Sequence, residues 1–258
     1  MKIVRFLNVV INLIMLGLFA ITLYLAAFLP KPWLTNWYNQ LCSWICQVII
    51  NLLGLEITVH NRERLTQFPQ AIFISNHPSE IEIFFFLPLL KSTSGLFERE
   101  ILQLPFIGRI FAATAKIFID RNDASSRQIG LIHALNHLKS GNHLVILPEG
   151  KCSQPLREKF HLGAFALSFQ TNLPIVPIYI DYRDKQAFKA GRGIKHHQLI
   201  LRIFRSKNRK VDIYCFKPVM PTTYQDYKTY CDAVYRQYVE WQTYLMDGQR
   251  TLWTSQLG

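Results

Sequence analysis

Acidic residues are scarce in this chain of 258 residues. It has 17 Asp and Glu against 29 Lys and Arg, a formal net charge of +12. Ten of the basic residues fall between 183 and 210, where Asp184 is the single acid. A basic face of this kind suits anionic headgroups and phosphorylated substrates. Nucleic acid is the competing partner, but the sequence contains no recognisable nucleic-acid module, so we expect no nucleic-acid binding.

Several chemical signatures are also missing. The five cysteines are odd in number and lack paired-ligand spacing, which argues against a disulfide framework and against a metal site. The chain has no Gly-x-Ser-x-Gly turn, which counts against a serine hydrolase. Internal repeats and low-complexity tracts are absent. The length therefore predicts one large catalytic domain with a small appendage.

The apolar excess is concentrated at the N-terminus. We interpret residues 1–55 as a membrane-anchoring motif of two helices and residues 56–258 as the catalytic domain. From Ile3 to Leu29 only Arg5 is charged. A helix of that length is about 40 Å long, against a hydrocarbon core of roughly 30 Å. A cleaved signal sequence is the alternative, although this apolar stretch is long for one.

A second uncharged stretch runs from Pro32 to Leu55. Polar residues recur in it at helical spacing, namely Gln40, Ser43, Gln47 and Asn51. The pattern predicts a helix with one polar stripe, and its tryptophans favour a position in the membrane interface. An amphipathic helix packed on its own domain is the alternative. We expect membrane attachment, with the catalytic domain on the cytoplasmic side.

Beyond Gly54, strand-like and helix-like segments alternate. Strands are expected at 57–60, 71–75, 116–120, 144–147, 175–180, 199–204 and 211–216, and helices at 79–90, 123–139, 160–170 and 224–252. This alternation predicts an α/β fold with a mixed, largely parallel sheet flanked by helices.

The most informative segment, residues 76–82, has the sequence Asn-His-Pro-Ser-Glu-Ile-Glu and follows an apolar run. Ligands of α/β sheets bind beyond the carboxyl ends of strands, so His77 lies where chemistry is expected. An imidazole oriented by a carboxylate can take a proton from a hydroxyl at neutral pH. A capping box is the alternative, with Ser79 as the N-cap and Glu82 at the third helical position.

Three further segments lie at the ends of expected strands. Residues 118–121 end in the guanidinium of Arg121, and residues 147–151 end in Pro-Glu-Gly and a lysine. Residues 173–178 form a strand that prolines bracket. Each segment is weak evidence alone, but their order and spacing behind residues 76–82 are far more specific.

With these blocks in this order, the sequence from about 71 to 179 resembles the glycerolipid acyltransferase family, whose best-known members are 1-acylglycerol-3-phosphate acyltransferases. The family's blocks read Asn-His-x-Ser-x-x-Asp, Phe-Ile-Asp-Arg, Pro-Glu-Gly-Thr-Arg-Ser and Pro-(Ile/Val)-Val-Pro-(Ile/Val). Residues 98–108 are also similar to its Lys-x-Glu-Leu…Pro-x-x-Gly stretch.

The resemblance implies an acyltransferase that moves a fatty acyl group from a thioester, acyl-CoA or acyl carrier protein, to the hydroxyl of a lysophospholipid. His77 is implied as the general base and Glu82 as its carboxylate partner. The implied substrate-binding residues are Asn76, Ser79, Arg121, Glu149, Gly150 and Lys151. Arg121 is expected to bind the acceptor's phosphate. No cofactor or metal is expected, because the thioester donor is already activated.

The sequence departs from the family pattern at two places. Glu82 stands where the family has Asp, which leaves Glu80 as a rival partner of the imidazole. Lys151 and Cys152 replace Thr and Arg in the third block. The missing guanidinium concerns the acceptor pocket, and Lys151 offers only a point charge in its place. Acyl transfer is therefore better supported than lysophosphatidic acid as the acceptor.

Two other functions stay open. The first is a thioester hydrolase, in which water replaces the acceptor or Cys152 acts as the nucleophile. A half-buried structural thiol is the favoured interpretation of Cys152. The second is a catalytically silent lipid-binding protein with the same fold.

Overall fold

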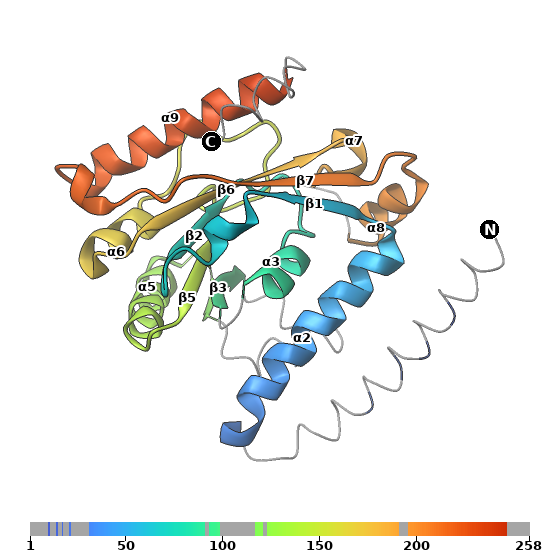
Figure 1. The fold of residues 1–258 in the computed structure, drawn as a ribbon, viewed down its shortest axis with the longest axis horizontal. Coiled ribbons are helices and arrows are strands. Elements are labelled where there is room, and N and C mark those ends of the chain that lie inside the picture. The colour runs from blue at the N-terminus through green and yellow to red at the C-terminus, as the bar shows by residue number, and fades with distance from the viewer. Residues whose placement is uncertain are drawn as a thin grey trace.

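The sheet is mixed and largely parallel, as predicted. This computed structural model describes residues 10, 14, 17, 21, 31–90, 93–98, 117–120, 123–190 and 196–246. Within them, seven strands form a sheet in the order β1-β7-β6-β2-β5-β3-β4 (Figure 1). The strands are β1 (Glu56–His60), β2 (Ile72–Ser75), β3 (Thr93–Glu98), β4 (Ile117–Ile119), β5 (His143–Ile146), β6 (Ile175–Tyr182) and β7 (Lys210–Cys215). Among the described strands, only β6 and β7 pair antiparallel.

Helices cover both faces of the sheet (Figure 1). The described helices are α2 (Lys31–Leu53), α3 (Ile83–Leu89), α5 (Ala124–Lys139), α6 (Gly163–Thr171), α7 (Lys185–Phe188), α8 (His196–Arg205) and α9 (Tyr227–Met246), with short 3₁₀ turns η1 (Arg62–Leu65) and η3 (Pro221–Thr223). Buried side chains of α2, α3, α7 and α8 share one core cluster, while those of α5, α6 and α9 share the other.

Strand β2 shows why the sheet is buried on both sides. All four of its residues are buried, and successive side chains enter opposite clusters. Phe73 belongs to the α3 side, whereas Ile72 and Ile74 belong to the α9 side. Side chains of a strand alternate between faces, and parallel sheets need apolar residues on both.

A tyrosine of α9 completes the hydrogen bonding of the sheet where β6 contains a proline. Pro177 lies beside Ile74 in the pairing of β2 with β6, and it has no N–H to donate. The Tyr238 hydroxyl accepts from the Ile178 N–H at 3.1 Å and lies 3.0 Å from the Ile74 carbonyl oxygen. The strand therefore continues through Pro177, as the strand predicted at 175–180 requires, and extends to Tyr182.

The strand expected at 199–204 is wrong, because these residues belong to helix α8. Leu199 and Ile203, one helical turn apart, are buried in the core, whereas Leu201 and Phe204 are exposed. The mixture of apolar and basic residues has helical spacing, and burial of one face outweighs the strand propensity of the run. The structure also contains β3 and α7, which the sequence did not predict.

The second predicted N-terminal helix is present as α2. Its residues Gln40, Gln47 and Asn51 are exposed, while Cys46 and Ile50 are buried against the domain. Apart from residues 10, 14, 17 and 21, the span predicted at 3–29 lies outside the described residues. Among the described helices, none combines the length and apolarity needed to cross a bilayer. The two-helix membrane motif and the division at residue 55 stay predictions.

Candidate active site

The candidate site lies along one edge of the sheet. Strands β2, β5 and β6 are parallel neighbours, so their carboxyl ends meet there. Asn76 and His77 follow β2, Glu149 follows β5, and Tyr182 ends β6. Residues that are separated by more than a hundred positions in the chain, such as Asn76 and Tyr182, thereby lie at the same edge of the sheet.

His77 and Glu82 form a hydrogen-bonded pair. Nδ1 of His77 lies 2.7 Å from Oε2 of Glu82, and the side chains are 12% and 0% exposed. Ser79 does not cap α3, which begins only at Ile83, and Glu82 binds the imidazole, so the capping-box alternative does not replace the pair. The Glu82 carboxylate nevertheless also accepts from the Ser79 backbone N–H, which is the contact that a capping box would make. Helix α3 therefore begins four residues later than the helix predicted at 79, and the intervening turn carries Glu82 back to the imidazole. The catalytic roles of the pair stay predictions.

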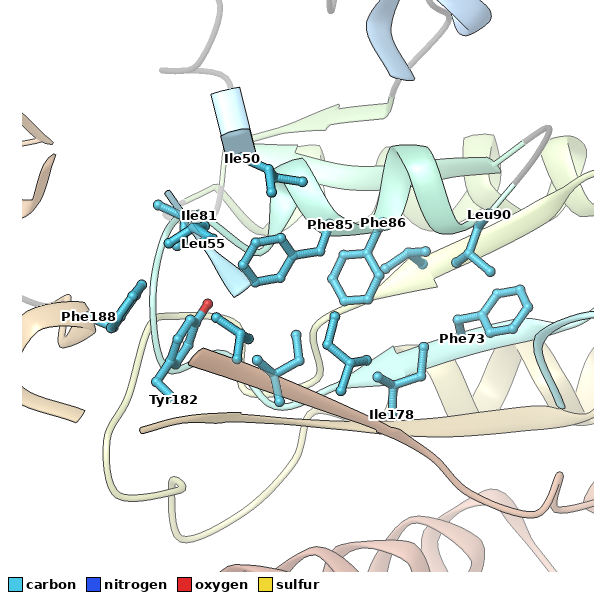
Figure 2. Close-up of a cluster of buried hydrophobic side chains, with 14 of the residues drawn as sticks. Ile50, Leu55, Phe73, Ile81, Phe85, Phe86, Leu90, Ile178, Tyr182 and Phe188 are labelled. Carbon is cyan, nitrogen blue, oxygen red and sulfur yellow. The ribbon is translucent and has the colours of Figure 1, made fainter. Parts of the chain in front are cut away.

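Tyr182 binds the carboxylate oxygen of Glu82 that His77 leaves unused. Its hydroxyl donates to Oε1 at 2.6 Å, and its ring stacks on Phe188 with centroids 4.3 Å apart. Figure 2 shows Tyr182 in the apolar cluster on the α3 side of the sheet, beside Phe188. Sequence reasoning missed Tyr182, since the predicted strand stopped at Ile180. The one signal in the sequence was a tyrosine two residues beyond the end of the predicted strand, close to the edge of the sheet where ligands bind.

Burial governs the ionisation of this group. Burial raises the pKa of Glu82, while the hydrogen bonds from His77 and Tyr182 act in the opposite direction. Burial and the neighbouring Glu82 carboxylate hold the pKa of Tyr182 well above its usual range. The tyrosine therefore keeps its hydrogen and remains a donor. When Glu82 is ionised it accepts only, so Nδ1 of His77 carries the hydrogen and Nε2 is left as the basic nitrogen.

Asn76 fixes the position at which the His77 loop leaves the sheet. Its amide nitrogen donates to the Ile180 carbonyl oxygen at 2.9 Å, and its Oδ1 accepts from the Ile180 N–H at 2.7 Å. Asn76 is 5% exposed. The predicted contact with a substrate stays a prediction, and the observed contacts tie β2 to β6.

Glu149 joins the loop after β5 to the loop after β2. Its Oε1 accepts from the His77 N–H at 2.8 Å and its Oε2 from the Arg157 N–H at 3.0 Å. The carboxylate is fully buried, and burial raises the pKa of Glu149. Gly150 follows with a φ of +72°, and a Cβ there would lie 2.8 Å from the His161 ring. The loop therefore needs glycine at this position.

Cys152 lies against the basic nitrogen of His77. Its Sγ is 3.2 Å from Nε2 and 3.3 Å from the carbonyl oxygen of Ser79. The next residue, Ser153, donates its N–H to the His77 carbonyl oxygen at 2.8 Å. The thiol is half-buried, as expected, but it contacts the proposed base, which the interpretation as a structural thiol did not anticipate.

The remaining predicted residues differ in their surroundings. Ser79 is fully buried, and its side chain has Tyr182 as a partner. Lys151 is exposed, and Arg121 lies outside the described residues. Arg157, which sequence reasoning missed, is exposed and donates from Nη1 to the Glu149 carbonyl oxygen at 3.1 Å. A guanidinium is thus present in the loop that lacks the family's arginine.

Comparisons with known proteins place this chain beside acyltransferases. A model of the acyltransferase family matches residues 56–181. The 1-acyl-sn-glycerol-3-phosphate acyltransferase of Limnanthes douglasii is 30% identical over 165 residues, which cover 61% of this chain and 57% of that protein. The protein of the same name from Saccharomyces cerevisiae is 29% identical over 161 residues, covering 60% and 52%. The chain spans about half the length of these relatives.

A solved structure shares the fold. The crystal structure of the 1-acyl-sn-glycerophosphate (LPA) acyltransferase PlsC from Thermotoga maritima superposes with a TM-score of 0.65, covering 93% of this chain and 97% of that one. The sequence identity is 16%, so this likeness concerns the fold alone.

Proposed function

We propose that this chain, whose residues 56–181 match a model of the acyltransferase family, is a membrane-bound O-acyltransferase of the glycerolipid acyltransferase family. The proposed reaction moves a fatty acyl group from acyl-CoA or acyl carrier protein to the hydroxyl of a lysophospholipid such as 1-acylglycerol-3-phosphate.

The contact between His77 and Glu82 carries the proposal. A carboxylate 2.7 Å from Nδ1 holds the imidazole in the tautomer that leaves Nε2 basic. The acceptor hydroxyl has a high pKa and needs a base within hydrogen-bond reach as its oxygen attacks the acyl carbonyl. In the proposed step Nε2 takes the hydroxyl proton and returns it to the departing thiolate. Tyr182 keeps Glu82 in place throughout.

Basic residues of the loop after β5 and of the predicted block at 118–121 suit a phosphorylated acceptor. We propose Arg121 as the phosphate ligand, as the family resemblance implies. Lys151 and Arg157 are exposed in the loop after β5, and the Arg157 guanidinium lies beside the Glu149 carbonyl. A guanidinium can hold a phosphate through two parallel hydrogen bonds.

The test is to incubate the purified full chain with labelled acyl-CoA or acyl carrier protein and a panel of lysolipids, and to identify products by mass spectrometry. We expect a diacyl product from a phosphorylated lysolipid. Transfer to neutral lysolipids alone would contradict the proposed acceptor class, and no acyl transfer to any lysolipid would contradict the reaction.

One observation favours a second candidate function, a thioester hydrolase. The Cys152 thiol lies 3.2 Å from His77 Nε2, which is the geometry of a thiol activated by a base. The same assay separates the two functions. A hydrolase releases free fatty acid at the same rate with and without lysolipid, whereas a transferase needs the acceptor for rapid turnover.

A further inference from the structure

We propose that the exposed face of helix α8 is a docking surface for anionic lipid membranes. This α8 face consists of Leu201, Phe204 and Arg205, with Lys207 exposed just beyond the end of the helix. It is separate from the membrane segment predicted at 3–29. The inference rests on the proposed function, because a membrane-bound acyltransferase takes its lysolipid from a bilayer. It deepens that function by naming a surface that holds the site against the bilayer.

Helix α8 buries one apolar side and exposes another. Leu199 and Ile203, four residues apart, are 2% and 0% exposed and enter the core on the α3 side of the sheet. Leu201 and Phe204 lie on the opposite side of the helix and are 47% and 46% exposed. Side chains three or four positions apart share one face of a helix, so the exposed Arg205 lies beside them. Large apolar side chains next to cations are typical of helices that lie in a membrane interface.

Charge distinguishes the α8 face from another exposed apolar pair. Ile129 and Ile132 on α5 are also three residues apart and are 53% and 54% exposed. The residues three or four positions from either of them include no Lys, Arg, Asp or Glu. The residues at the same spacing from the α8 pair include two exposed cations, Arg205 and Lys207, and no acid. A negatively charged lipid surface therefore attracts the α8 face and not the α5 pair.

Helix α8 packs beside α2, the helix predicted to lie in the membrane interface (Figure 1). Arg209 joins the ends of the two helices, because its guanidinium donates to the Phe204 carbonyl oxygen at 2.8 Å and to the Leu53 carbonyl oxygen at 3.3 Å. On α2, Trp44 is 37% exposed, and tryptophan is enriched at the headgroup level of membranes. The α8 face is therefore fixed next to a helix that suits the same environment. This position favours a bilayer over an acidic protein as the partner.

Hydrogen bonds connect helix α8 to the candidate site. Arg202 of α8 donates to the carbonyl oxygen of Lys189, which follows α7. The next residue, Ala190, donates its N–H to the carbonyl oxygen of Pro78 at 3.4 Å, and Pro78 is the neighbour of His77. A membrane that contacts α8 is thereby held close to the loop of the proposed base, where a lysolipid needs to present its hydroxyl.

The test places a photoreactive side chain on the α8 face of the full chain. Phe204→p-benzoylphenylalanine is reconstituted with vesicles of phosphatidylcholine and phosphatidylglycerol in equal parts, or of phosphatidylcholine alone, and is irradiated. We expect a phospholipid adduct on the peptide containing residue 204 in the anionic vesicles, identified by mass spectrometry. Ile132→p-benzoylphenylalanine on α5 is the matched control and should form no such adduct above background. No lipid adduct at residue 204, or equal yields on anionic and neutral vesicles, would overturn the docking surface.

Removal of charge tests the attraction to anionic lipid. With Arg205→Gln/Lys207→Gln added, the yield of the adduct at residue 204 should fall at least about fivefold, because each cation near an anionic surface strengthens binding. Lys228→Gln/Arg236→Gln removes two exposed cations from α9, on the other face of the sheet, and should leave the yield unchanged. Equal losses in the two double variants would contradict a specific role of the α8 face. Acyl carrier protein added with the vesicles should not compete, and an adduct to it in place of lipid would overturn the membrane as the partner.

Acyl transfer is measured separately, so that the docking surface and the proposed function can fail independently. Leu201→Gln/Phe204→Gln should lower transfer to a lysolipid in anionic vesicles at least about fivefold, because interfacial binding scales with buried apolar area. Transfer to a short-chain, water-soluble lysolipid should keep the wild-type rate. Ile129→Gln/Ile132→Gln is the matched control and should keep both rates. An equal loss with both acceptors would overturn the docking surface, whereas a lipid adduct without any acyl transfer would overturn the proposed function and keep the surface.

Discussion

The loop after β2 and the loop after β5 meet at the candidate site but are built differently. In the β2 loop, Asn76 and Glu82 are buried, and both of their polar side chains are engaged. In the β5 loop Glu149 is buried, whereas Lys151 and Arg157 are exposed. One loop therefore orients the imidazole and the other presents charge to solvent.

Replacing His77 by Ala tests this comparison with the largest expected effect. Acyl transfer should fall by about 10²–10⁴-fold, the usual contribution of a general base. The matched control is His133→Ala, an exposed histidine on α5, which should keep its rate. Acyl transfer is measured as product formed per enzyme, with thermal unfolding to verify the fold. A rate within about threefold of the wild type would remove His77 from the mechanism.

Glu82→Gln tests which carboxylate is the partner of the His77 imidazole. We expect transfer to fall by roughly 10- to 100-fold, because a charge-assisted hydrogen bond contributes about 1.5–3 kcal/mol. Glu80→Gln is the matched control and should cost far less. Equal losses in the two variants would contradict the assigned partner.

The same variant should change the pH dependence of unfolding. Burial raises the pKa of Glu82 above its ordinary value of 4.5, so the folded state binds the proton more tightly than the unfolded state. The contribution of the protonated Glu82 to the free energy of unfolding is therefore complete below about pH 4.5. It is lost as the pH rises through the pKa that Glu82 has in the folded protein. Glu82→Gln should show a smaller loss of stability over that window. Denaturant unfolding at a series of pH values measures the free energy of unfolding of the variant and of the wild type. The same dependence on pH in both proteins would contradict the raised pKa of Glu82.

Tyr182→Phe should have an intermediate effect. Removing the hydroxyl that donates to Glu82 should lower kcat by about tenfold, since a hydrogen bond to a charged group contributes about 1.5–3 kcal/mol. The pKa of Glu82 should rise further, which moves the acid limb of the kcat–pH profile to higher pH. Tyr230→Phe, whose hydroxyl bonds the Val219 carbonyl on the other side of the sheet, is the control. A lower rate with an unmoved acid limb would indicate packing rather than proton control.

Arg157→Ala should have the smallest effect and should act on the acceptor. An exposed charge pair contributes about 0.2–1 kcal/mol, so KM for a phosphorylated acceptor should rise by roughly two- to fivefold with kcat retained. Lys139→Ala, an exposed lysine at the end of α5, should change neither constant. A loss confined to kcat would assign Arg157 to the chemical step.

Local pattern was a good guide where one strand or helix decides the structure. The expected strands at 71–75, 144–147 and 211–216 are present as β2, β5 and β7, because buried apolar runs bounded by turns have few alternatives. The pattern failed at α8, whose apolar run was assigned to a strand. There the choice depended on which face the core would cover, and that is a property of neighbouring elements.

In the candidate site, too, the sequence predicted the local contacts and missed those between distant segments. The sequence placed His77 at the end of a strand, and the family resemblance favoured Glu82 as its partner, because Glu82 stands at the position of the family's aspartate. The structure shows the contact between His77 and Glu82. The sequence could not place Tyr182 or Arg157, or bring Cys152 to Nε2, because these contacts join separate segments. Spacing along the chain carries no information about which strands become neighbours.

The order of residues alone determined the layered α/β class and an imidazole close to an acid, since both depend on short-range periodicity and turn chemistry. Only the tertiary structure decided that a thiol from another loop lies on that imidazole and that a tyrosine from a third strand holds the acid. The physical reason is the parallel pairing of β5, β2 and β6, which brings their carboxyl ends to one edge of the sheet.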